Sequence, residues 1–95
     1  MTYTVQKDVV LVTVCDENFL VATGEARGKV RYIEGVTRPG AYFWRQLEAH
    51  TDTDEIIRQA ASDYNAPEET AKLAFEKFTS SLQKKGYLTL DKEKS

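Results

Sequence analysis

Apolar residues follow a strand-like pattern in the first third of the chain. Residues 8–16 are rich in valine and bounded by aspartate, and residues 19–24 alternate weakly between apolar and polar positions. β-branched and aromatic residues favour strands, and the acidic stretch between these two segments has the composition of a turn. The pattern predicts a hairpin of two strands, a connecting loop over residues 24–29 and a third strand that begins at Val30. We therefore expect a small three-stranded antiparallel sheet.

The spacing of apolar residues changes from two to about 3.6 after the third strand, which marks the start of a helix. One face of this helix would carry Gly40, Phe43, Trp44 and Leu47, at i, i+3, i+4 and i+7. Thr37 is the natural N-cap, because its hydroxyl can accept a hydrogen bond from a backbone N–H in the first turn. A proline in that turn fits the assignment, since it loses no hydrogen bond there. The sequence thus predicts a helix whose buried face contains the only tryptophan.

Two further helices are expected in the second half of the chain. Residues 52–55 place an aspartate at the N-cap and a glutamate three positions later, which is the arrangement of a capping box. A third helix follows Pro67 and ends at Gly86, a residue that favours the left-handed cap conformation. Its apolar stripe comprises Ala71, Phe75, Phe78 and Leu82. After it, residues 87–90 are expected to pack back on the domain as a short extended tail.

Three strands followed by three helices, without a linker or an internal repeat, indicate one α+β domain with winged-helix character. The domain would span residues 1–95, with its core in residues 8–90 and a charged C-terminal tail over residues 91–95. A chain of 95 residues with 41% hydrophobic and 29% charged side chains can bury a core, and this composition is not typical of a disordered protein. The residues assigned to that core include Trp44, Tyr64, Phe78 and Leu82.

The charge balance narrows the classes of partner. The 13 basic and 15 acidic side chains give a net charge of -2, so no overall positive field attracts nucleic acid or anionic lipid. The longest apolar run, residues 9–14, is too short to cross a bilayer, and the first residues lack the charged region of a signal peptide. We expect a cytosolic protein that binds neither nucleic acid nor a membrane.

Few residues are suited to catalysis or metal binding. His50 is the only histidine and lies in a predicted turn between helices, where a surface or capping role accounts for it. Cys15 is the only cysteine, and the acidic residues that follow it disfavour its thiolate form. The sequence contains no nucleophile elbow, phosphate-binding loop or zinc-ligand spacing. These features predict a protein that is not an enzyme and uses no metal or cofactor.

Four short segments appear in a characteristic order along the chain. They are a strand ending in Gly-Glu-Ala at residues 19–26, Gly-Ala-Tyr-Phe-Trp at residues 40–44, Asp-Glu-Ile at residues 54–56 and Lys-Gly-Tyr-Leu at residues 85–88. In their order and spacing the sequence resembles the PqqD-like proteins, named for the D protein of pyrroloquinoline quinone synthesis, over residues 8–90. It departs from the Leu-Asn-x-Thr-Gly stretch that usually precedes the first helix of that family, and it has His50 where the family tends to have glycine.

The resemblance implies a peptide-binding module. PqqD-like proteins are recognition elements that capture the leader segment of a ribosomally synthesised, post-translationally modified peptide. They deliver it to a modifying enzyme, often a radical S-adenosylmethionine protein. An extended peptide can add as a further strand to an exposed sheet edge, while a neighbouring helix supplies pockets for its side chains. The resemblance therefore implies a peptide-binding groove between the third strand and the third helix.

Residues on both elements are expected to bind the peptide. On the strand they are Arg31, Tyr32, Ile33, Glu34 and Gly35, and on the helix they are Lys72, Phe75, Glu76, Thr79 and Gln83. Arg31 and Lys72 would pair with acidic leader residues, and Ile33 would contact an apolar one. Lys72, Glu76 and Gln83 equally fit a solvated helix face. A shift of one residue in the strand register would exchange its two faces, but backbone pairing with the peptide would persist.

Two other functions stay open. A winged arrangement can place a recognition helix in the major groove of DNA, although the third helix mixes acidic and basic residues and the domain is acidic overall. An adaptor domain can pair its exposed sheet edge with a second copy of itself. Besides the precursor peptide and its modifying enzyme, a second copy of the chain is thus a possible partner, and we expect a monomer or a weak homodimer.

Overall fold

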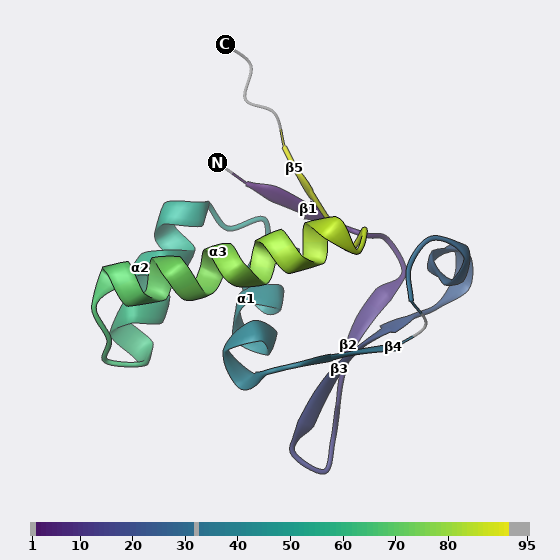
Figure 1. Ribbon diagram of the computed structural model, residues 1–95, viewed down its shortest axis with the longest axis horizontal. Helices are drawn as coiled ribbons and strands as arrows, with labels where there is room; N and C mark the ends of the chain where they lie inside the picture. The colour runs from purple at the N-terminus through teal and green to yellow at the C-terminus, as the bar shows by residue number, and fades with distance from the viewer. Residues whose placement is uncertain (1, 32, 92–95) are drawn as a thin grey trace.

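The computed structural model describes residues 2–31 and 33–91. Its elements, in chain order, are β1 (Tyr3–Val5), β2 (Val9–Val14), β3 (Glu17–Ala22), the 3₁₀ helix η1 (Gly24–Gly28), β4 (Ile33–Val36), α1 (Arg38–Glu48), α2 (Thr53–Asp63), α3 (Glu68–Lys84) and β5 (Leu88–Leu90). Figure 1 shows the three helices gathered together and the β2–β3 hairpin projecting away from them. A three-stranded sheet followed by three helices confirms the predicted α+β, winged-helix-like fold.

β2, β3 and β4 form an antiparallel sheet in that order. Leu11 lies opposite Leu20, and Leu20 lies opposite Glu34. The tip of the β2–β3 hairpin is a two-residue turn in which Cys15 and Asp16 both have positive φ, at 49° and 65°. Positive φ at both central residues matches the right-handed twist of a hairpin, although glycine and asparagine adopt it more readily. In this order of strands, β4 lies at one edge of the sheet.

The beginning of the chain contributes a strand that the sequence pattern does not reveal. β1 pairs antiparallel with β5, with Tyr3 opposite Leu90. The expected packing of residues 87–90 against the domain is thus confirmed, but their partners precede residue 8, where the predicted core began. Both strands have three residues, which is too short for period-two alternation to stand out from the sequence.

The connection between β3 and β4 is more regular than the predicted loop. η1 occupies most of it, and the Ala26 carbonyl accepts from the N–H groups of Lys29 at 3.0 Å and Val30 at 3.1 Å. Because these bonds hold Val30 in a turn, β4 begins at Ile33 and not at Val30 as expected. The strand itself and its pairing with β3 follow the prediction.

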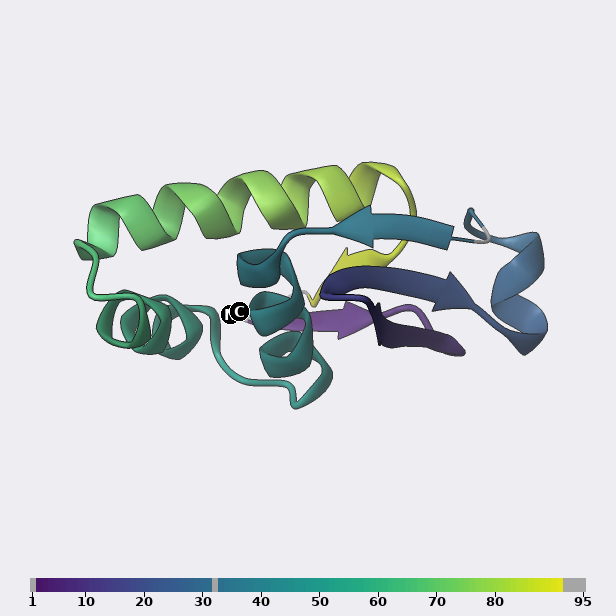
Figure 2. The same ribbon diagram turned by 90° about the horizontal axis from the view of Figure 1, so that it is seen from below.

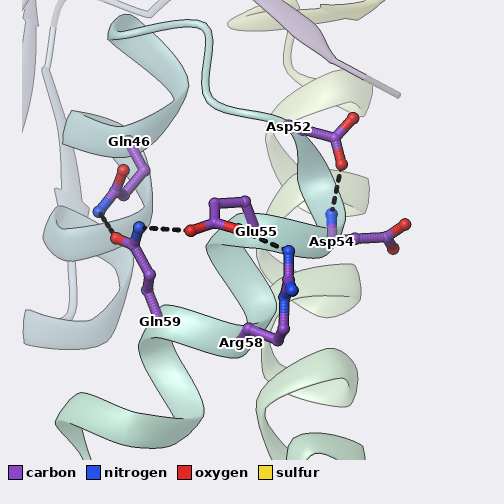
Figure 3. A network of polar contacts seen from close by, with 6 residues as sticks. All are labelled: Gln46, Asp52, Asp54, Glu55, Arg58 and Gln59. Atoms are coloured by element: carbon purple, nitrogen blue, oxygen red, sulfur yellow. Dashed lines mark hydrogen bonds and ion pairs between the residues drawn. The ribbon is translucent and has the colours of Figure 1, made fainter.

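Capping hydrogen bonds confirm the predicted starts of the first two helices. Thr37 Oγ1 accepts from the Gly40 N–H at 3.1 Å, and Pro39 lies in the first turn of α1. Asp52 Oδ2 accepts from the Asp54 N–H at 3.1 Å at the start of α2. Figure 3 shows this second cap beside a polar network that joins α1 to α2, formed by Gln46, Glu55, Arg58 and Gln59.

The core lies between the helices and the inner face of the sheet. Its largest fully buried side chains are Trp44, Tyr87, Phe75, Leu20, Leu47 and Ile56. Trp44 therefore occupies the buried helical face that its spacing predicted, whereas Tyr64 is 50% exposed and lies outside the core to which it was assigned. Gly86 ends α3 in the expected left-handed conformation, with φ of 89°. Figure 2 shows α3 running alongside β4, so the helix and the edge strand frame one side of the molecule.

Candidate functional site

One edge of β4 is unpaired in the described part of the chain. β4 pairs with β3 on one side, and no other described strand pairs with its second side. An edge of this kind offers backbone N–H and C=O groups to an added strand. Because α3 runs alongside β4 (Figure 2), a strand added there would lie next to the helix.

A hollow with a volume of about 320 Å³ lies between β4 and α3, and we call it the β4–α3 groove. It is lined by Glu34, Gly35, Val36 and Thr37 on the strand side and by Ala74, Lys77, Phe78, Ser81 and Leu82 on the helix side. The helix residues follow one another at helical spacing, so they form one continuous face of α3. Val36, Phe78 and Leu82 make this lining largely apolar, and Lys77 adds a positive charge.

At one end of the groove, α1 and α3 approach each other closely. A Cβ atom at Gly40 would lie 2.9 Å from Phe78 Cε1, which is too short for an ordinary contact. The missing side chain of Gly40 therefore lets the first turn of α1 reach the Phe78 ring. The centre of this ring also lies 5.8 Å from that of Phe43. These contacts hold the half-buried Phe78 at the border between the core and the groove.

At the Glu34 end of the groove, ion pairs connect the strand to the helix. Lys85, which follows α3, places Nζ 2.7 Å from Glu34 Oε2, and Arg31 places Nη1 3.5 Å from Glu34 Oε1. The Glu34 side chain is only 14% exposed, so its carboxylate depends on these cations for compensation. Glu34 Oε1 has no hydrogen-bond partner among the described residues. Glu34 thus ties β4 to α3 and retains an oxygen that can accept a hydrogen bond.

A buried tyrosine fixes the backbone that leads into β4. The Tyr87 hydroxyl donates to the Arg31 carbonyl at 3.1 Å, and the Tyr87 side chain is fully buried. Burial raises the pKa of Tyr87 above its ordinary value, and the negative charge of Glu34 raises it further. The hydroxyl therefore keeps its proton at neutral pH and remains a donor to the main chain.

The strand residues expected to bind a peptide fall in β4 or immediately before it. Ile33, Glu34 and Gly35 lie in β4, Arg31 precedes it, and Tyr32 lies outside the described residues. Glu34 and Gly35 line the β4–α3 groove. Ile33 is 48% exposed and, as a strand neighbour of Glu34, points to the opposite face of the sheet.

Two of the helix residues expected in the groove are buried in the core. Thr79 is 3% exposed, and its hydroxyl donates to the carbonyls of Phe75 and Glu76 at 3.0 and 3.2 Å. Phe75 is 1% exposed and makes edge-to-face contacts with the rings of Tyr3 and Phe43. Neither side chain therefore presents a surface to the β4–α3 groove.

The remaining helix residues from the sequence analysis lie on a different flank of α3. Lys72 and Glu76 line a separate hollow of about 380 Å³, which we call the α2–α3 hollow. Its other lining residues are Tyr3, Thr53, Asp54, Ile57 and Phe75. Gln83 is exposed and belongs to the lining of neither hollow. Lys72 and Glu76 thus border α2 and β1, and the structure does not bring them together with β4 in the β4–α3 groove.

The flank of α3 that does face β4 was not singled out from the sequence. Ala74, Lys77 and Ser81 are not among the residues that the sequence predicts to bind a peptide, and Phe78 and Leu82 are assigned to the core. The buried row of α3 consists of Ala71, Phe75, Thr79 and Leu82. Thr79 is polar, so the predicted apolar stripe contains Phe78 in its place. This difference moves the predicted peptide-facing flank to another side of the helix. An aromatic residue between small residues on one helix face was the available signal.

Two findings concern other kinds of site. Among residues 2–31 and 33–91, no three His, Cys, Asp or Glu side chains gather as metal ligands would. No helix in the described part of the chain combines the length and the apolar character needed to cross a bilayer. His50 and Cys15 are both exposed, and each lies in a turn with positive φ.

The fold and the groove define a small α+β domain with an open strand edge beside a helix. The family model for Coenzyme PQQ synthesis protein D (PqqD) matches residues 33–88, which is more than half of the chain. The chain belongs to the PqqD family. The matched segment begins at β4 and includes all of α3, so it contains every residue that lines the β4–α3 groove.

The fold is also that of a solved structure, TbiB1 in complex with the TbiA(beta) leader peptide. The two chains share 20% sequence identity with a TM-score of 0.74, over 95% of this chain and 99% of that one. A comparison with curated proteins gives no significant match. At this level of identity the likeness to TbiB1 concerns the fold.

Proposed function

We propose that this protein recognises the leader segment of a ribosomally synthesised precursor peptide and presents it to the enzyme that modifies the peptide. Membership of the PqqD family supports this proposal, as does the likeness in fold to TbiB1, which was solved with a leader peptide. The observation that carries it is the unpaired edge of β4 beside the groove that α3 lines. The modifying enzyme is proposed to be a radical S-adenosylmethionine protein, as it often is for PqqD-like proteins.

In the proposed binding mode, the leader adds as a strand to the free edge of β4. Hydrogen bonds between the two backbones would supply affinity that does not depend on the leader sequence. Alternate side chains of the leader would point to the same side as Glu34 and Val36, into the β4–α3 groove. An apolar leader side chain would contact Val36, Phe78 and Leu82 there. Full burial of such a side chain contributes about 1.5–3 kcal/mol, so one or two anchors would dominate specificity.

Positive side chains favour an acidic leader. Lys77 lines the groove, and Lys85 and Arg31 stand at its Glu34 end. Since Lys85 and Arg31 already compensate Glu34, Lys77 is the main candidate to pair with a leader carboxylate. An exposed ion pair contributes only about 0.5 kcal/mol. The charges would therefore set the orientation and the association rate of the leader more than its affinity.

The proposed site keeps the strand half of the sequence prediction and changes the helix half. Arg31, Ile33, Glu34 and Gly35 remain, through their backbone or their side chains. The helix half consists of Ala74, Lys77, Phe78, Ser81 and Leu82.

Two adjacent serines of α3 provide a matched test of the groove. Ser81 lines it, whereas Ser80 is exposed and does not. The probe is a synthetic leader peptide from the precursor encoded beside this gene, titrated by calorimetry. Ser81→Tyr should weaken its binding at least about tenfold, and Ser80→Tyr should change it less than about twofold. Equal effects of the two substitutions would contradict the groove, and binding of duplex DNA in place of the peptide would contradict the function.

The backbone part of the proposal has its own test. Single amides of the leader peptide are replaced in turn by N-methyl amides, which cannot donate. In an added strand, the N–H groups of alternate residues point toward the neighbouring strand. The loss of affinity should therefore alternate with a period of two residues along the leader. A loss that follows a helical period, or none at all, would rule out strand addition.

A further inference from the structure

The face of the β2–β3–β4 sheet that points away from the core is apolar. Cross-strand partners share a face of a sheet, and the register places Val10, Val21 and Ile33 in one row. The next row joins Val12 to Phe19. We call this surface the outer sheet face. With Val14 near the hairpin tip, it comprises Val10, Val12, Val14, Phe19, Val21 and Ile33.

The outer sheet face is in contact with solvent. Val10, Val14 and Ile33 are 43%, 53% and 48% exposed, and the other members are half-buried. None of its members packs in the core of the described residues. A sheet with one solvated face normally carries polar residues there, yet Glu17 at the tip is the one charged residue of these strands that shares this face. A contiguous apolar surface of this kind marks an interaction site.

We infer that a second copy of this chain covers the outer sheet face, in a symmetric dimer whose two sheets pack face to face. Aligned sheet packing of this type interdigitates apolar side chains from two faces about 10 Å apart. The same patch on both copies satisfies the self-complementarity that a two-fold axis demands. Figure 1 shows that the β2–β3 hairpin extends beyond the helices, which leaves it accessible to another molecule.

The charges at the two ends of the sheet select the orientation of the second copy. The hairpin tip carries Asp16 and Glu17, and Arg38 across a small hollow offsets one of these charges. The opposite end carries more basic than acidic residues, namely Lys7, Arg27 and Lys29 against Asp8 and Glu25, while Arg31 is offset by Glu34. A two-fold axis that crosses the strands places the acidic tip of each copy over the basic end of the other. An axis along the strands would stack like charges instead.

Face packing differs from the edge pairing that the sequence left open. Since the edge of β4 stays free, each copy of the dimer could still take one peptide. The inference therefore does not rest on the proposed function, and the two can fail separately. Ser81→Tyr, which blocks the groove, should leave the molecular mass in solution unchanged.

The first experiment measures the mass of the intact protein by sedimentation equilibrium up to about 1 mM. The wild type should form a dimer within this range. Val10→Thr combined with Val14→Thr keeps the β-branched shape but removes apolar surface, so the dimer should dissociate at least about tenfold more readily. Leu73→Gln is the control, because Leu73 is 61% exposed and lies on α3, outside the β2–β3–β4 sheet. Circular dichroism checks that each variant is folded.

The second experiment tests the orientation with the native thiol. Cys15 is exposed at the acidic tip, and Lys29 lies at the opposite end of the sheet. A short bis-maleimide should cross-link Lys29→Cys into dimers efficiently through Cys15 of the other copy, and should cross-link the wild type poorly. A protein that stays monomeric, or a dimer that Val10→Thr/Val14→Thr leaves intact, would overturn the inference. Efficient cross-linking of wild-type Cys15 to itself would overturn the head-to-tail orientation.

Discussion

At the scale of single residues, the contact between Gly40 and Phe78 reverses the effect on stability that a glycine-to-alanine substitution usually has in a helix. Alanine is a better helix former than glycine by about 1 kcal/mol. At Gly40, however, its Cβ would meet Phe78 Cε1 at 2.9 Å and Thr37 Oγ1 at 3.2 Å. Either the ring or the N-cap must shift, so Gly40→Ala should lower the free energy of unfolding by about 1 kcal/mol. Urea denaturation measures this change.

Two further variants test whether the contact between Gly40 and Phe78 causes the loss of stability. Gly28 has no atom within 4 Å of its would-be Cβ, so Gly28→Ala should be neutral or slightly stabilising. Combining Gly40→Ala with Phe78→Leu removes the clashing ring atoms and should recover part of the lost stability. If Gly40→Ala alone stabilises the protein, the close approach of α1 to α3 is not what the structure indicates.

The ion pair between Lys85 and Glu34 carries a second prediction at this scale. Lys85→Met would leave the 14% exposed Glu34 carboxylate with Arg31 alone, at 3.5 Å. Loss of one partner of a shielded pair costs more than loss of a surface pair, and we expect about 1–2 kcal/mol because Lys85 is itself 37% exposed. Lys84→Met is the matched control at the end of the same helix. Denaturation in urea should show a smaller loss for this control.

A double variant separates the effect of breaking the ion pair from the effect of losing the lysine side chain. When Lys85→Met is combined with Glu34→Gln, no shielded charge is left without a partner, because Arg31, the other partner of Glu34, is 71% exposed. The loss should therefore be smaller than for Lys85→Met by itself. Equal stability of Lys85→Met and Lys84→Met would show that the Lys85–Glu34 contact does not hold β4 against α3.

At the scale of elements, the β1–β5 pair should depend on pH through Asp91. The Thr4 and Thr2 hydroxyls donate to the Asp91 carboxylate at 2.6 and 2.8 Å, and these bonds lower the pKa of Asp91 below its ordinary value. A carboxyl with a lowered pKa in the folded state stabilises the fold above its ordinary pKa of about 3.9. That contribution is lost as the pH falls through the lowered value. Pairing of β1 with β5 should therefore loosen in acid.

An NMR titration of the Asp91 carboxyl carbon checks this linkage. Thr2→Val combined with Thr4→Val removes both donors, so the pKa should rise toward the ordinary value of aspartate. The β1 and β5 amides of this variant should also lose the acid-dependent part of their protection from exchange. An unchanged titration midpoint would mean that the two hydroxyls do not stabilise the carboxylate.

The elements differ in how far the sequence determines them. α1 and α2 follow from side chains that act locally, because Thr37 and Asp52 cap the turns in which they lie. β1 pairs with a strand at the far end of the chain, and its three residues are too few for a periodic pattern to predict it. Which side of α3 faces β4 depends on how the helix packs against the sheet. Thr79 is polar but buried, with its hydroxyl bonded to the helix backbone, so the sequence pattern does not show which side of α3 is buried.

At the scale of the whole molecule, two hollows lie on different flanks of α3, and each is a candidate site for a peptide. The β4–α3 groove lies on one flank and includes Lys77. The α2–α3 hollow lies on the other and includes Lys72, the lysine that the sequence analysis favoured. The unpaired edge of β4 borders the first hollow and not the second, which is why the proposed function places the leader there.

The two lysines allow a direct comparison of the hollows. Both are exposed on α3, and both substitutions change the net charge equally. For an acidic leader at low ionic strength, Lys77→Glu replaces an attraction of about 0.5 kcal/mol by a repulsion of similar size and should weaken binding about fivefold. Lys72→Glu should have a smaller effect that comes from net charge alone. Added salt should reduce both effects. If Lys72→Glu weakens binding more, the leader occupies the α2–α3 hollow, and strand addition to β4 cannot be its main binding mode.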